Sequence, residues 1–169
     1  MKIFFAFVFL LILSGCAKQP VHPPVGGILS EKDMQQSQNR IKNLNQMERS
    51  QIEEWIGNQE QKFYAMPLNY WADIPNLQNR NPKKEGEMVS YEYLIYDFAG
   101  TKVYDQPIER KNVLLGKFEE LKAVENIVKY LEKNEHATLL VPSTLAYGTY
   151  GDNDKITNDV PLIIKITNH

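Results

Sequence analysis

The chain has 169 residues, of which 43% are hydrophobic and 24% are charged, a composition typical of a globular protein. Its formal net charge of −2 at pH 7 gives no basic surface field, so we expect no nucleic-acid partner. The single cysteine excludes an internal disulfide and a cysteine-based zinc site, and the length allows one domain with appendages.

Residues 1–15 have the pattern of a signal peptide. A basic start at Lys2 precedes an apolar run over residues 3–13, which is too short to span a bilayer. The small residues before Cys16 resemble the lipobox of bacterial lipoproteins, which implies cleavage before the cysteine and acylation of its thiol with chains such as palmitate. Two or three acyl chains give stable anchoring. We therefore expect a lipid anchor in a bacterial membrane of the cell envelope, with the outer membrane favoured and the protein on either its periplasmic face or the cell surface; an ordinary secretory signal with an incidental cysteine is the alternative.

The next two segments are a predicted tether and a helical extension. Residues 16–29 contain three prolines and two glycines and cannot build a core. Residues 30–59 begin with a predicted N-cap at Ser30. As far as Met47 the sequence is polar, which indicates either an exposed helix or disorder. Beyond it, Ile52, Trp55 and Ile56 form an apolar stripe that predicts a helix ending near Gly57.

Residues 60–169 have the pattern of a mixed domain. The segment 89–97 alternates, with Val89, Tyr91, Tyr93 and Ile95 facing inward. We expect a hairpin turn at 98–101, a returning strand at 102–105, a polar connector at 106–112 and a short strand at 113–115.

The rest of the domain predicts one helix and two strands. Apolar residues at helical spacing over 119–132 indicate an amphipathic helix lying across the sheet. Apolar strands at 138–141 and 162–167 enclose a Gly/Asp/Asn-rich loop that follows Tyr147. The predicted fold is α+β: a bent antiparallel sheet (a half-barrel) with one helix packed across its concave face, preceded by the short helical extension.

The domain resembles the FKBP-type peptidyl-prolyl isomerases. The matching segments are 139–142, 146–148, Gly151 and 162–164, and the family pattern fits without a gap from Gly116 to Gly148. The resemblance implies an isomerase or folding helper for proline-containing exported or envelope proteins. The layout of lipobox, tether, helix and domain also resembles the gliding-motility-associated FKBP-type lipoproteins, which would imply a role in gliding motility.

Isomerisation of an X–Pro bond needs no nucleophile, metal or other cofactor. The barrier of about 18–20 kcal/mol reflects amide resonance, which an apolar slot with one or two hydrogen-bond donors can weaken. No histidine lies at metal-ligand spacing, and the Asp-rich loop at 152–154 does not fit a calcium loop, so we expect no metal.

The resemblance also implies roles for individual residues. Tyr147 would form a wall of the slot for the proline ring and donate a hydrogen bond from its hydroxyl. Asp105 would be the polar group at the rim of the slot. These two are the expected catalytic residues. The backbone N–H of Leu121 would donate to the substrate carbonyl. The substrate-binding residues are expected to be Tyr93 and Tyr104 (walls), Leu121 and Val124 (floor) and Ile164 (back wall).

The sequence departs from the family at three pocket positions. Val124 replaces a tryptophan, Glu120 a small apolar residue and Ile164 a phenylalanine. Loss of a large ring contact reduces the complementarity of the slot. A non-catalytic FKBP-like binding module of an envelope or motility assembly is therefore the alternative function.

Overall fold

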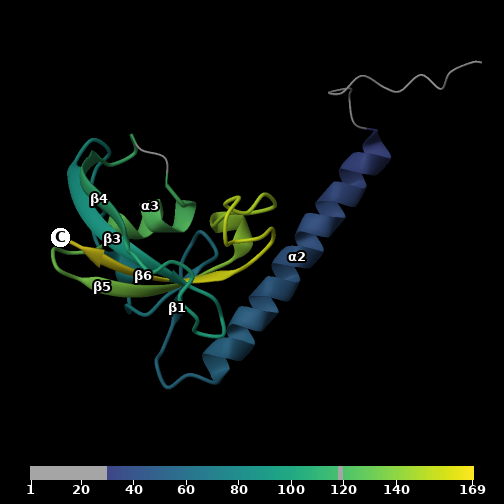
Figure 1. Cartoon of the computed structure of the whole chain (residues 1–169), viewed down its shortest axis with the longest axis horizontal. Helices are drawn as coiled ribbons and strands as arrows, with labels where there is room; N and C mark the ends of the chain where they lie inside the picture. Colours follow the sequence, from purple (N-terminus) through teal and green to yellow (C-terminus); the bar gives the residue numbers. More distant parts are fainter. Residues whose placement is uncertain (1–29, 118–119) are drawn as a thin grey trace, which may run out of the picture. The chain divides into compact units, whose positions relative to one another are not determined.

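The computed structural model describes residues 30–117 and 120–169 (Figure 1). The predictions for the signal peptide, the tether and Cys16 lie outside the described residues. The chain divides into two compact units, residues 1–36 and 37–169, and the described part of the first unit is the start of one helix. No helix in the described ranges is long and apolar enough to cross a membrane.

Helix α2, Glu31–Gly57, is continuous. At its start the Asp33 backbone N–H donates to Ser30 Oγ at 3.2 Å, and the Ser30 hydroxyl donates back to the Asp33 carboxylate at 2.6 Å, as predicted for an N-cap. The helix ends at Gly57, also as predicted. Its polar first half is exposed but helical, so the alternative of disorder is wrong for residues 31–47.

The domain is built on one six-stranded antiparallel sheet. The strand order is β1-β2-β5-β6-β3-β4, which confirms the α+β class and the antiparallel sheet. Helix α3, Lys122–Val128, packs on one face (Figure 1). The strands are β1 Tyr64–Ala65, β2 Trp71–Ala72, β3 Met88–Tyr96, β4 Ile108–Leu114, β5 His136–Val141 and β6 Leu162–Asn168. Two short 3-10 helices, η1 Leu77–Asn79 and η2 Ser143–Leu145, lie in the connections.

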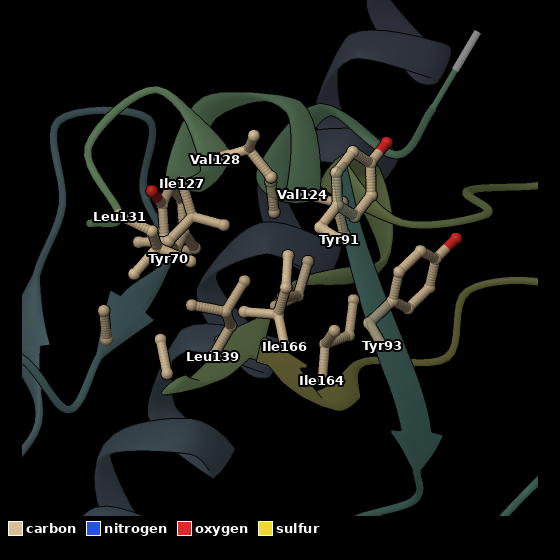
Figure 2. Packing of buried hydrophobic residues seen from close by; sticks show 14 of the residues in the cluster. Tyr70, Tyr91, Tyr93, Val124, Ile127, Val128, Leu131, Leu139, Ile164 and Ile166 are labelled. Carbon is tan, nitrogen blue, oxygen red and sulfur yellow. The ribbon is translucent and has the colours of Figure 1, made fainter. Parts of the chain in front are cut away.

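The central strands bury one face in the main core, and β5 and β6 also bury part of the other face near α2. Successive side chains of a strand point to opposite sides, so Ile164 of β6 joins the main core with α3, whereas Ile163 faces the C-terminal half of α2. Figure 2 shows the α3 side. The main core includes Tyr70, Tyr91, Tyr93, Ile95, Val124, Ile127, Leu131, Leu139, Ile164 and Ile166. The second cluster consists of Ile52, Trp71, Leu140 and Ile163, with Trp55, Ile56, Phe63, Tyr96 and Phe98 packed against it.

Two predicted elements differ from the structure. Residues 102–105 are not a strand; only a single bridge joins Lys102 to Tyr96. The strand that returns along β3 is β4, which occupies most of the predicted connector. Strand β4 lies at the sheet edge and carries charged outward side chains, which conceal its strand pattern. The predicted helix at 119–132 is also too long, because after Val128 the chain turns with an i→i+3 bond from Tyr130 to Ile127.

Candidate functional site

The site begins with two tyrosines on the inner face of β3. Because their positions differ by two, Tyr91 and Tyr93 point to the same side of the sheet, and their rings stack at 6.4 Å between centroids (Figure 2). Both are buried. The Tyr93 hydroxyl donates to Glu120 Oε1 at 2.7 Å and the Tyr91 hydroxyl to Glu120 Oε2 at 3.1 Å. Burial, reinforced by Glu120, raises the pKa of both phenols, so they remain hydrogen-bond donors.

Glu120 stands immediately before α3 and has a buried carboxylate, with only 4% of its side chain exposed. The backbone N–H of Leu121 donates to Oε1 at 3.2 Å, and Arg110 Nε lies 3.2 Å from Oε2. With the two phenols, the carboxylate therefore has two partners on each oxygen. This arrangement is what a buried charge requires to avoid a large desolvation penalty.

Arg110 reaches Glu120 because of a bulge in β4. Val89 pairs with Val113, but Tyr91 pairs with Arg110, so three residue steps on β4 match two on β3. A shift of one residue moves a side chain to the other face of a sheet. Asn112, with a left-handed φ of 52°, lies in the bulge and donates its backbone N–H to Ser90 Oγ at 3.0 Å. The bulge thus places Arg110 on the same face as Tyr91.

Tyr147 follows η2 and is half-buried against the main core. The next residue, Gly148, makes two backbone hydrogen bonds of 2.8 Å. Its N–H donates to the Ser143 carbonyl, and its own carbonyl accepts from the Asp159 N–H. Burial first, then the charges of Asp152 and Glu120, raise the pKa of Tyr147. Among the described residues its hydroxyl has no hydrogen-bond partner, so this donor is free for a ligand.

Tyr104 is tied to the loop after Tyr147. Its hydroxyl donates to the Asp152 carboxylate, and the Lys155 ammonium lies 5.2 Å from the ring centroid. The hydrogen bond to Asp152 raises the pKa of Tyr104 to about 12. The other Asp152 oxygen accepts from the backbone N–H groups of Asp154 at 3.0 Å and Ile156 at 2.9 Å. The loop is therefore an ordered wall of the site.

The match to a known family decides the identity of the domain. The family model for the FKBP-type peptidyl-prolyl cis-trans isomerase matches residues 79–168, more than half of the chain. The chain belongs to this family. No curated protein matches it.

Two solved structures are similar in fold. FkpA from Escherichia coli has a TM-score of 0.54 at 14% identity, covering 83% of this chain and 72% of FkpA. A peptidyl-prolyl cis-trans isomerase from Pseudomonas syringae pv. tomato has a TM-score of 0.51 at 16% identity, covering 75% of this chain and 92% of that one. At these identities the likeness establishes the fold alone.

The FKBP-type site predicted from the sequence is brought together in part. Tyr93, Val124 and Ile164 are buried in the main core, and Tyr104, Leu121 and Tyr147 pack against it. Asp105 does not join them: it is exposed, and its backbone carbonyl accepts a hydrogen bond from Lys102 at 2.7 Å. The carboxylate bonded to Tyr93 belongs instead to Glu120.

Sequence reasoning missed the roles of Glu120, Arg110 and Asp152. Glu120 was visible as a departure from the family pattern, but Arg110 reaches it only through the bulge. A hollow of about 400 Å³ lies away from the predicted site and is lined by residues including Trp55, Phe98 and Pro161. Among the described residues, no group of three His, Cys, Asp or Glu side chains could hold a metal.

Proposed function

We propose that this FKBP-type chain catalyses cis–trans isomerisation of X–Pro bonds in exported or envelope proteins. The observation that carries the proposal is the free hydroxyl of Tyr147 beside an apolar cluster. That cluster includes Tyr93, Leu121 and Val124. A proline ring requires such an apolar surface, and the carbonyl beside it requires a donor.

The proposed mechanism uses no covalent step. A planar prolyl amide is strongly dipolar, whereas the twisted transition state is less so, and an apolar site therefore favours the twisted form. The Tyr147 phenol is protonated at neutral pH, like an ordinary tyrosine, and burial raises its pKa further, so it can donate to a substrate carbonyl and hold the peptide on one side of the bond. The part of the peptide on the other side of the X–Pro bond then rotates about that bond.

A protease-coupled assay with a prolyl tetrapeptide tests this function on the chain starting at residue 17. We expect turnover above the uncatalysed rate, and Tyr147→Phe should lower kcat/KM roughly tenfold through loss of one hydrogen bond. Tyr150→Phe is the matched control, because Tyr150 lies in the same loop and is 88% exposed. Asp105→Ala tests the predicted rim role and should have a smaller effect, since Asp105 is exposed. A wild-type rate equal to background would reject the proposal.

We also propose that a lipid on Cys16 anchors the protein in the outer membrane of the cell envelope. The support is the apolar run at 3–13 followed by small residues and the only cysteine. Labelling cells with radioactive palmitate should mark the wild type and not Cys16→Ala, which should also leave the membrane fraction. Equal labelling of both would contradict the anchor.

The resemblance of the layout to gliding-motility lipoproteins supports a role in gliding. Deleting the gene in its own bacterium should abolish cell spreading, and expressing the wild-type chain should restore it. Unchanged spreading of the deletion strain would exclude this role.

One observation favours the alternative, a non-catalytic binding module. The Leu121 N–H, the expected donor to the substrate carbonyl, already donates to Glu120. Absence of turnover together with measurable binding of prolyl peptides would support this alternative.

A further inference from the structure

The Leu121 N–H has an internal acceptor in the position where a substrate carbonyl would bind. Glu120 Oε1 accepts from this N–H at 3.2 Å and from the Tyr93 hydroxyl at 2.7 Å. A backbone N–H donates one strong hydrogen bond at a time. A peptide carbonyl can therefore use the Leu121 donor only after the Glu120 oxygen has left it.

The remaining partners hold the carboxylate near the donor. Oε2 accepts from the Tyr91 hydroxyl at 3.1 Å and lies 3.2 Å from Arg110 Nε. Because Arg110 is brought to this face by the β4 bulge, the fold supplies a dedicated counter-charge. Hydrogen bonds to a charged acceptor are about twice as strong as neutral ones, so a neutral peptide carbonyl is the weaker acceptor.

We propose that Glu120 is a positioning residue that competes with the substrate carbonyl for the Leu121 N–H and so sets the affinity of the site for prolyl peptides. The proposal rests on the proposed binding of prolyl peptides at this site. Each peptide must displace Oε1 from Leu121, while Arg110 and Tyr91 retain Oε2. The apparent dissociation constant is then the intrinsic one divided by the fraction of molecules in which Leu121 is free.

The test is peptide binding to the full chain, purified in mild detergent. The probe is fluorescein-labelled Ala-Leu-Pro-Phe, followed by fluorescence anisotropy. Glu120→Ala removes the competitor and should tighten Kd roughly tenfold. Glu120→Gln keeps a neutral acceptor, so its Kd should lie between the Kd values of Glu120→Ala and the wild type. Glu109→Gln removes a nearby exposed carboxylate on β4 and should leave Kd unchanged.

A spectroscopic readout separates this role from a structural one. In protein labelled with ¹⁵N-leucine, the Leu121 amide proton should resonate upfield in free Glu120→Ala relative to the wild type, because it has lost a charged acceptor. Peptide should return it downfield. In kinetic assays the same variant should lower KM with kcat unchanged.

The outcomes distinguish this proposal from the proposed enzymatic function. Tighter binding and a peptide-sensitive Leu121 amide without any turnover would support the role of Glu120 and reject catalysis. A Kd for Glu120→Ala within twofold of the wild type, or a Leu121 amide that peptide does not move, would overturn the role of Glu120. If Glu120→Ala does not fold, the same two measurements are made on Glu120→Gln, with Glu109→Gln as its control. A Kd for Glu120→Gln equal to that of the wild type would then overturn the role of Glu120.

Discussion

At the scale of single residues, the hydrogen bond between Tyr104 and Asp152 should make the stability of the fold depend on pH in the alkaline range. The folded state raises the pKa of Tyr104 from 10.0 to about 12. Below pH 10 the phenol is protonated in both folded and unfolded chains, so the contribution of the bond is complete. Between about pH 10 and 12 only the unfolded chain loses the proton, and the contribution is lost.

The difference in the free energy of unfolding between the wild type and Tyr104→Phe should therefore become smaller as pH rises from 9 to 12. Urea unfolding at each pH measures this difference. Tyr150→Phe, whose parent side chain is 88% exposed, should show no such trend. A difference between Tyr104→Phe and the wild type that is constant with pH would show that the bond does not form.

A second residue-scale prediction concerns Gly151. Its φ is +67°, and a Cβ there would lie 2.2 Å from the carbonyl oxygen of Ile156. Gly100 also has a positive φ, +82°, but its Cβ would meet nothing within 4 Å. Gly100→Ala should cost about 1 kcal/mol for the left-handed conformation alone. Gly151→Ala should cost at least about 3 kcal/mol, because the backbone contact must also be relieved.

Urea unfolding of both glycine variants measures the contrast. Equal losses of stability in the two would mean that the Gly151–Ile156 approach is not present in solution.

At the scale of elements, Glu48 joins α2 to the connection after β5. Glu48 is 2% exposed, and its carboxylate accepts from the Ser143 backbone N–H at 2.8 Å and from the Ser143 hydroxyl at 2.6 Å. Glu48→Ala leaves two buried donors unpaired and should lower the free energy of unfolding by about 2–3 kcal/mol. Glu54→Ala, an exposed residue of the same helix, should change it by less than about 0.5 kcal/mol.

Thermal or urea denaturation followed by tryptophan fluorescence measures these losses, because Trp55 of α2 contacts Phe63 and Phe98 edge-on. If Glu48→Ala and Glu54→Ala were equally stable, the packing of α2 against the domain would not depend on the Glu48–Ser143 bonds.

The elements also show what the sequence could predict. The inward face of β3, the closing strand β6 and the cap at Ser30 were correct, because each depends on local periodicity or spacing. Most of strand β4 was missed, and only its end was covered by the strand predicted at 113–115, since an edge strand with charged outward residues resembles a polar loop. The bulge at Asn112 was also missed, because the register of a strand depends on its partner.

The buried positions of the candidate site residues were predicted only where the side chains lie on regular elements. Tyr93, Val124 and Ile164 belong to strands and a helix whose inward faces follow from the sequence. Asp105 lies in a connection that does not form the expected strand, and its side chain is exposed. The carboxylate that accepts from Tyr93 is that of Glu120, 27 positions further along the chain. Pairings between distant segments such as these depend on tertiary structure.

At the scale of the whole molecule, the proposed function depends on an apolar site between α3, β3 and the loop after Tyr147. That site combines a free donor, the Tyr147 hydroxyl, with an occupied one, the Leu121 N–H. The FKBP fold is thus retained while one donor is held by the chain itself. A family member built in this way should isomerise prolyl bonds with weak binding of short peptides.

The most direct test of the central claim is NMR exchange spectroscopy of a prolyl tetrapeptide, which measures the cis–trans rate without a protease. The uncatalysed process takes tens to hundreds of seconds. A catalytic amount of the wild-type chain should produce cis–trans exchange cross-peaks, and Tyr147→Phe should weaken them. Absence of exchange cross-peaks with the folded wild-type chain, at peptide concentrations where binding is detected, would contradict the claim that this protein is a prolyl isomerase.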